Sequence, residues 1–255
     1  MDAQAMNRPA TTRLQQAILH LPVPDWKAAA AALRQSANLD ASCSGDPDWT
    51  LLTHACRWDN VDIVRWLVEN GANPNVGGRS NRYKPLTLAA AHGYTEIIRL
   101  LLASRANIEA RDQSGWTSLA HAVWQDRGSS IALLLAHGAN PNARGPRGET
   151  VLMRAVNGAL VHAVSSVATI GLLLDHGLDP SIADDAGRTT LEFFVSARRE
   201  DLVAKLDTAL AAPSRAAIRC HLLDRLTADQ RTAWLPKSCA VETATRAVKD
   251  WGRKP

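Results

Sequence analysis

The chain repeats one arrangement of apolar and polar positions along most of its length. A leucine-rich run is followed by a polar stretch with glycine, asparagine and proline, and then by a threonine that precedes a second apolar segment. Within the runs, apolar residues such as Ile97, Ile98 and Leu101 recur at the spacing of a helix with one buried face. The pattern predicts pairs of short helices joined by turns, with little β-strand.

The repeating unit has a nearly constant length, which can be measured at one small apolar position. Ala72, Ala106, Ala139 and Leu178 occupy that position, and they are separated by steps of 34, 33 and 39 residues. A leucine in the second apolar segment keeps the same phase in successive copies, at positions 52, 86, 119, 152 and 191. Phased copies indicate an array of stacked units, none of which can bury its apolar face alone.

The residues of one unit predict how its helices begin and end. A threonine before the inner helix, as at Thr50 and Thr117, is suited to accept hydrogen bonds from free backbone N–H groups. A glycine after the outer helix, as at Gly71 and Gly138, allows the left-handed conformation that ends it. Arg105 stands at this glycine position in one unit, where a left-handed non-glycine residue costs roughly 1 kcal/mol.

This period, together with the Gly-Ala-Asn-Pro-Asn segments at residues 71–75 and 138–142, resembles the ankyrin repeat over about residues 24–210. The resemblance implies an all-α fold, an α-solenoid of helix-turn-helix units with projecting β-hairpin turns. One departure is consistent, because the family's Thr-Pro-Leu-His helix start is never complete. Its histidine, which bonds the neighbouring hairpin, is replaced in each unit, so we expect fewer such bonds here; the replacing residues are Thr53, Thr87, Ala120, Met153 and Glu192.

The repeat phase divides the chain into three segments. We expect a divergent N-terminal helical cap unit at residues 1–45, an array of about five units at residues 46–210, and a helical C-terminal extension at residues 211–255. The fourth unit has six extra residues within 157–164, and insertions in repeats often lie on the binding face. Outside the array, the apolar pattern predicts helices at residues 13–20, 25–35, 214–226, 228–235 and 241–251.

The charge of the chain is concentrated at its C-terminal end. Residues 1–210 carry 20 Lys and Arg against 21 Asp and Glu, whereas residues 211–255 carry 9 against 4. The four cysteines lack the close spacing of zinc or redox motifs, so we expect reduced thiols. Neither a secretory signal nor an apolar run of roughly 20 residues is visible. We therefore expect a cytoplasmic protein, with delivery into a host cell as an alternative.

The sequence carries no catalytic signature. A phosphate-binding glycine loop with lysine, a Gly-x-Ser-x-Gly nucleophile turn and a His-Glu-x-x-His zinc motif are all absent. Residues 77–80 fall at a hairpin tip by the repeat phase, rather than in a phosphate loop. His137 and His176 precede helix-ending glycines, where they can bond the last carbonyls. We expect no enzymatic activity, no metal and no cofactor.

The resemblance places the partner on a concave surface formed by hairpin tips and inner helices. Trp58 and Trp124 are the strongest candidates, since their position faces solvent in an isolated stack and tryptophan dominates interface energies. Trp49 and Trp116 have the alternative role of covering the first turn of an inner helix. The repeat phase assigns these partner-binding residues: Trp49, Arg57, Trp58, Tyr83, His92, Trp116, Trp124, Gln125, Arg147 and Arg188.

These features favour a non-enzymatic protein–protein interaction module that acts as adaptor, inhibitor or scaffold. Positive charge at the hairpin tips suits a partner with an acidic surface, although a solvated fringe explains the same charges. We expect a monomer that binds neither membrane nor nucleic acid. The alternative is a bacterial effector or regulatory protein whose basic C-terminal helices bind nucleic acid or an enzyme partner.

If the units stack as phased, circular dichroism should show dominant helix and little strand. Small-angle scattering should show an elongated, curved particle, because each unit contacts only its neighbours. A compact, sheet-rich particle would contradict the repeat assignment.

Overall fold

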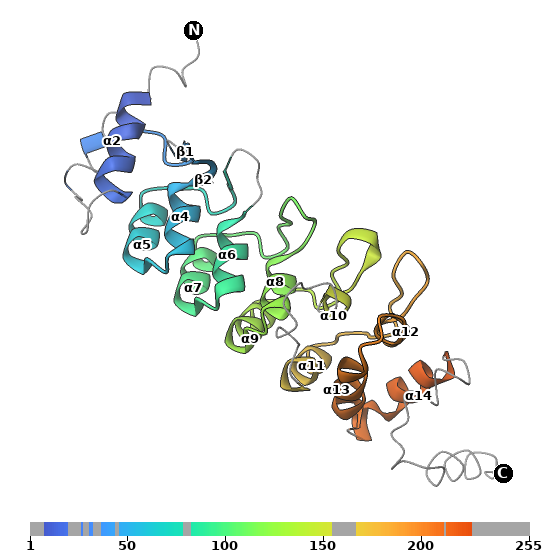
Figure 1. The fold of residues 1–255 in the computed structure, drawn as a ribbon. Helices are drawn as coiled ribbons and strands as arrows, with labels where there is room; N and C mark the ends of the chain where they lie inside the picture. The colour runs from blue at the N-terminus through green and yellow to red at the C-terminus, as the bar shows by residue number, and fades with distance from the viewer. Residues whose placement is uncertain are drawn as a thin grey trace, which may run out of the picture.

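The computed structural model describes residues 8–19, 27, 31–32, 37–43, 46–78, 83–154, 167–211 and 213–225. These residues form an elongated stack of helix pairs, with residues 8–19 and residues 216–224 at opposite ends of the stack (Figure 1). Hairpin-like turns project from one side of the stack (Figure 1). The fold is therefore an all-α ankyrin solenoid with little strand, as the sequence predicts.

The helices form an inner row and an outer row. The inner row contains α4 (Leu51–Arg57), α6 (Pro85–His92), α8 (Ser118–Trp124), α10 (Val151–Arg154) and α12 (Thr190–Ser196). The outer row contains α5 (Val61–Glu69), α7 (Thr95–Ala103), α9 (Gly128–Ala136), α11 (Val167–Asp175) and α13 (Glu200–Leu210).

The remaining elements lie at the two ends and in the projecting turns. At the N-terminal end, α2 (Arg8–Leu19) is followed by the antiparallel strands β1 (Ser42–Cys43) and β2 (Asp46–Thr50). At the C-terminal end, the short helix η3 (Pro213–Arg215) leads into α14 (Ala216–Asp224). One turn in the array contains η1 (Pro146–Gly148), and another is closed by a single bridge between Arg111 and Thr117.

Predictions outside the array are covered only in part. The helices predicted at residues 13–20 and 214–226 correspond to α2 and α14. The insertion at 157–164 and the helices at 228–235 and 241–251 lie outside the described residues, as does nearly all of 25–35. Among the helices that the structure describes, none is long and apolar enough to span a membrane.

One apolar core runs through the whole stack. The five phased leucines of the inner helices are each at most 2% exposed, and they are Leu52, Leu86, Leu119, Leu152 and Leu191. Outer helices add the buried residues of their own apolar stripes, such as Ile97, Ile98 and Leu101 of α7. Because α6, α8 and α10 each pack between two other inner helices, removal of one of their units would expose apolar surface on both of its neighbours.

The predicted caps begin most of the inner helices. The Thr50 side chain accepts a hydrogen bond from the Thr53 N–H, and Thr117 and Thr189 act in the same way at α8 and α12. Helix α6 is different, because Lys84 precedes it without a side-chain cap and Pro85 occupies its first turn. Proline suits that position because it has no N–H group that needs a partner.

A ladder of side-chain hydrogen bonds joins the turns of neighbouring units. Within a turn, an Asn or Asp side-chain oxygen accepts from the backbone N–H two residues later, as Asn73 accepts from Asn75. The side chain of this second residue then accepts from a backbone N–H in the turn of the next unit, as Asn75 accepts from Asn107. The bonds between units are Asn73 N–H to Asp40, Asn107 N–H to Asn75, Asn140 N–H to Glu109 and Asp179 N–H to Asn142, at 2.7–2.9 Å. The ladder thus supplies bonds between units in which the family histidine is missing.

Two of the residues that replace this histidine are hydrogen-bonded, and one of them bonds the next unit. The Thr87 hydroxyl lies 3.3 Å from the Ser118 hydroxyl at the start of α8. Thr53 instead closes a capping box with Thr50 inside its own unit. The substitutions therefore keep the buried polar groups at these two positions hydrogen-bonded.

The outer helices end in the left-handed conformation that their glycines allow. Gly71, Gly138 and Gly177 have φ values of 93°, 85° and 86°. Arg105 adopts φ 65° at the equivalent position, although its Cβ makes that conformation unfavourable. His176 bonds the Leu172 carbonyl through Nδ1, which confirms its predicted role at the end of α11.

We expect Arg105→Gly to raise the free energy of unfolding by about 0.5–1 kcal/mol, because glycine adopts positive φ without strain. The matched control is Arg99→Gly, which removes the same exposed side chain type from the middle of α7. This control should lower stability by about 1 kcal/mol, since glycine is unfavourable inside a helix. Urea denaturation measures both changes, and destabilisation by Arg105→Gly would contradict the expectation.

Candidate protein-binding surface

The aromatic and basic side chains at the two ends of the inner helices form one surface, which we call the inner-helix face. It comprises Trp49, Arg57, Trp58, Tyr83, His92, Trp116, Trp124, Arg127 and Arg154. Trp49, Tyr83 and Trp116 precede inner helices, whereas Arg57, His92 and Trp124 are the last residues of α4, α6 and α8. The repeat itself therefore positions these side chains, because equivalent helix ends recur from unit to unit.

The first group on this face surrounds Arg57. Its guanidinium carbon lies 5.3 Å from the centre of the Trp49 ring and 5.7 Å from that of Trp58. Trp49 in turn stacks on Tyr83 of the next unit, with ring centres 5.1 Å apart. The two indoles thus hold the cation by cation–π attraction, which is worth roughly 0.5–1 kcal/mol at an exposed site.

Trp58 is the most exposed large apolar side chain among the described residues. It is 67% exposed, although it contacts Arg57 and lies 6.4 Å from the ring of His54. The core of the unit does not need this indole, because α4 is already filled by Leu51, Leu52 and Ala55.

Basic groups continue along the face into the next two units. His92 stacks on Tyr94 at 5.4 Å, and Arg127 donates from Nε to the carbonyl of Ala91. Burial lowers the pKa of His92, and the positive charges of Arg57 and Arg127 lower it further. Arg57 and Arg127 are therefore close enough to act on His92, and the two arginines create a positive potential on this part of the face.

The second group surrounds Arg154 of α10. Its guanidinium carbon lies 4.5 Å from the ring centre of Trp116 and 5.2 Å from that of Trp124, both from the preceding unit. Arg154 is only 9% exposed, and Trp116 is 8% exposed. Gly145 leaves room for the Trp116 ring, since a Cβ at that position would overlap it. This group repeats the tryptophan–arginine arrangement of the first in a buried form.

Hydrogen bonding at Arg154 is incomplete. Nη2 donates to Nδ1 of His121 at 3.2 Å, whereas Nε and Nη1 have no partner although they are buried. Burial lowers the pKa of Arg154 to about 10, with Asp112 and Glu149 acting in the opposite direction. Buried donors without partners lower the free energy of unfolding, so the burial of Nε and Nη1 of Arg154 carries an energetic cost.

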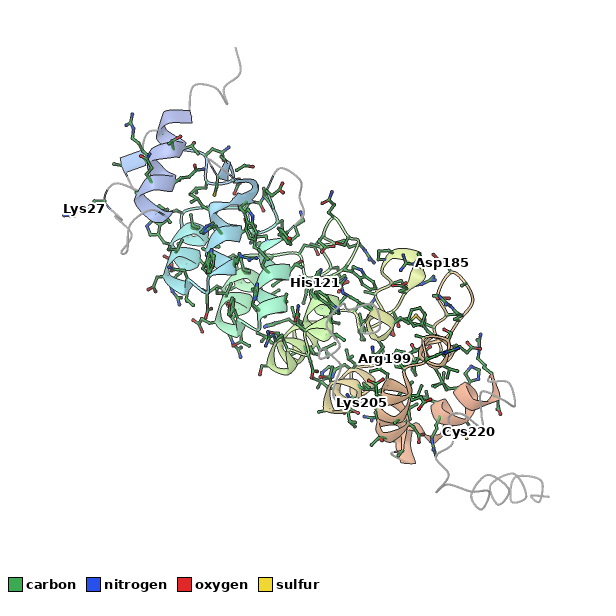
Figure 2. All side chains as sticks on the ribbon, viewed as in Figure 1. Lys27, His121, Asp185, Arg199, Lys205 and Cys220 are labelled. Carbon is green, nitrogen blue, oxygen red and sulfur yellow. The ribbon has the colours of Figure 1, made fainter. Side chains whose placement is uncertain are left out.

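Asp112 and His121 complete this group. Asp112 Oδ2 lies 2.7 Å from His121 Nε2, so Nε2 donates the proton and Nδ1 is left to accept from Arg154. Burial lowers the pKa of His121 and outweighs the hydrogen bond to Asp112, which raises it. For Asp112, burial alone would raise the pKa, yet the bond to His121 and nearby positive charge lower it overall. Figure 2 shows His121 near the middle of the stack.

Four of the predicted residues are engaged within the chain. Arg147 bonds Glu149 in the turn before α10, and Arg188 bonds Asp184 while lying 4.7 Å from the Phe193 ring. Gln125 ends α8 through its backbone N–H. Trp124 is half-buried against Arg154. A role for any of them in binding a partner stays a prediction.

Sequence reasoning missed Asp112 and Arg154. Arg154 occupies the same inner-helix phase as His54 and His121, so the repeat alignment contained a signal for it. Asp112 lies in a turn among other charged residues, and nothing in the sequence distinguishes it from them. In the described part of the chain, no group of three His, Cys, Asp or Glu side chains could hold a metal ion.

Comparisons with known proteins agree with this architecture. A family model for three copies of the ankyrin repeat matches residues 76–145, and a model for a single ankyrin repeat matches residues 47–76. The matched segments lie in the part of the stack from β2 to the turn before α10. The chain therefore contains ankyrin repeats over residues 47–145.

The chain spans well under half the length of the curated relatives it matches. The chain is 40% identical over 29% of its length to glycerophosphocholine phosphodiesterase gde1 of Schizosaccharomyces pombe, of which the match covers 6%. It is 29% identical over 51% of its length to a Rickettsia bellii protein named for its ankyrin repeats, and covers 38% of it. It is 30% identical over 62% of its length to the B-cell lymphoma 3 protein homolog of Mus musculus, and covers 36% of it.

We expect His121 to make the stability of the protein depend on pH. Because its pKa is lower in the folded chain than in the unfolded one, acid favours unfolding, and stability should fall as pH decreases below about 6.5. A single group of this kind contributes at most about 1.4 kcal/mol per pH unit.

Replacement of His121 by Gln, which can still donate to Asp112, should reduce this loss between pH 7 and 5. His137→Gln controls for the removal of an exposed histidine at the end of α9. Thermal unfolding at several pH values provides the comparison. Equal pH dependence in the wild type and in His121→Gln would show that His121 is not responsible.

Proposed function

We propose that this protein binds a partner protein with an acidic surface through the inner-helix face, and that it performs no catalysis itself. Ankyrin repeats generally mediate protein–protein interactions, and family models for this repeat match residues 47–145. The inner-helix face is the side that corresponds to the concave binding surface in the family. The proposed mechanism is steric, so that the protein occupies, inhibits or bridges its partner as a monomer.

Trp58 is the observation that carries this proposal. Trp58 is 67% exposed, so most of its apolar surface remains in water. That surface contributes no hydrophobic stabilisation to the monomer. Tryptophan and arginine are the residues most often responsible for binding energy at protein interfaces, and here Arg57 lies beside Trp58. The pair therefore has the composition of an interface centre.

The charge of the face supports an acidic partner. Arg57 and Arg127 both lie near His92, whereas Arg144 and Arg147 in the projecting turns are paired with Asp185 and Glu149. Complementary charge accelerates association and rejects partners of the wrong sign. The similarity to the phosphodiesterase does not favour enzymatic activity, since the match covers only 6% of that protein.

Truncation of Trp58 to Ala should weaken partner binding by about 2 kcal/mol, or roughly 30-fold, if the indole is an interface centre. Stability should change by less than about 0.5 kcal/mol, because the side chain is exposed. A partner captured from the native organism and identified by mass spectrometry supplies the ligand, and calorimetry then measures the affinity.

The control is Trp66→Ala in α5, whose half-buried ring packs against the core. This variant should lose stability while its folded fraction keeps the affinity of the wild type. A Trp58→Ala variant with a lower melting temperature and unchanged affinity would falsify the proposed role of this face.

A further inference from the structure

Arg57 is a cation held in place without any anion. In the part of the chain that the structure describes, its guanidinium makes neither a hydrogen bond nor an ion pair, although Trp49 and Trp58 contact it. An exposed arginine normally samples many conformations, and ordering it costs entropy. Here the contacts with the indole rings of Trp49 and Trp58 offset this entropic cost, so the N–H donors of Arg57 are already positioned for a ligand.

The surrounding carboxylates do not neutralise Arg57. Asp59 lies in the turn after α4 but makes no ion pair with Arg57 among the described contacts. Asp126, at the equivalent turn of the unit after next, accepts from the Thr169 hydroxyl. Arg127 extends the positive charge along the face, and its Nε is bound only to a backbone carbonyl. The face therefore has uncompensated positive charge at Arg57.

From this geometry we propose that Arg57 is the receptor for a carboxylate, presented by an acidic segment of the partner and bound between Trp49 and Trp58. This inference rests on the proposed function and specifies the chemistry of the same face. The plane of a carboxylate matches the guanidinium fork, which can donate two parallel hydrogen bonds to it. The indoles would flank the resulting ion pair and exclude water from it, which strengthens the attraction between the charges.

The second guanidinium between two indoles does not compete for this role. Arg154 is 9% exposed, and its two free donors are buried, so an incoming chain meets Arg57 first. Arg154 is moreover engaged with His121 on one side. The exposed group around Arg57 is thus suited to binding, whereas the buried group around Arg154 is suited to packing.

The distribution of charge favours a peptide over a nucleic acid. Residues 1–210 carry 20 basic against 21 acidic side chains, so the chain up to the end of the array has a net charge of −1. A nucleic acid presents a charge at every phosphate and needs a continuous row of cations. A single ordered guanidinium with limited positive charge nearby suits isolated carboxylates of Asp or Glu instead.

The test uses the full chain and a short fluorescent peptide of alternating glutamate and serine, with a glutamine–serine peptide of equal length as the uncharged probe. Fluorescence anisotropy should detect the acidic peptide and not the uncharged one. Arg57→Gln should weaken binding by about tenfold, because it removes a charge-assisted, paired hydrogen bond. Arg57→Lys should also weaken it, since an ammonium cannot form the planar fork.

Arg99→Gln is the matched control, because it removes one positive charge from the outer helix α7 and leaves the inner-helix face unchanged. Its affinity for the acidic peptide should equal that of the wild type. Equal losses of affinity for the acidic peptide in Arg57→Gln and Arg99→Gln would show that the effect comes from net charge alone, and would overturn the proposal. Stronger binding of an oligo-dT of the same length would overturn it in favour of nucleic acid.

Failure of this inference can be separated from failure of the proposed function. If the acidic peptide does not bind while Trp58→Ala still weakens capture of the natural partner, the carboxylate receptor is refuted and the binding face stands. If Trp58→Ala leaves the natural partner bound with full affinity, the face itself is refuted. Binding of the acidic peptide that depends on Arg57 but not on Arg99 supports the proposal.

Discussion

The structure depends on stacking, because no helix pair in this chain can bury its apolar face alone. Helices α6, α8 and α10 each pack between the inner helices of two neighbouring units, and the phased leucines of all five inner helices are almost fully buried. The side-chain ladder through the turns sets the distance and register at which those helices meet. The inner helices therefore provide the apolar burial of a unit, and its turns provide the polar contacts that fix the register. A substitution in the helices leaves the ladder intact, and one in the turns leaves the helix packing intact.

This division of roles explains why the aromatic and basic side chains of the inner-helix face lie at the helix ends. Interior positions of the short inner helices are committed to packing, so side chains free to vary occur where a helix begins or ends. Equivalent ends recur from unit to unit, and tryptophan and arginine placed there meet within one unit around Arg57 and across two units around Arg154. Two tryptophan–arginine groups result, one open around Arg57 and one closed around Arg154.

The sequence predicts the elements well because period and caps are local signals. Thr50, Thr117 and Arg105 act as expected from their own units. It does not distinguish Trp58 from Trp124, which lie at the ends of inner helices two units apart, one position apart in phase, but differ in exposure. The difference comes from the following unit, which supplies Arg154 beside Trp124 and a buried Leu88 at the equivalent position after Trp58. Contacts between units depend on pairs of residues far apart in the sequence, and a single repeat pattern does not encode them.

The ladder also has a direction and an end. In every turn up to Asn142, the second side chain is long enough to reach forward to the next turn. At the last turn this position is Ser181, whose hydroxyl bonds back to Asp179 of its own turn. A unit duplicated inside the array would inherit both halves of the connection, whereas one appended after Ser181 would meet no forward-reaching side chain. The array can thus lengthen by internal duplication far more readily than by growth at this end.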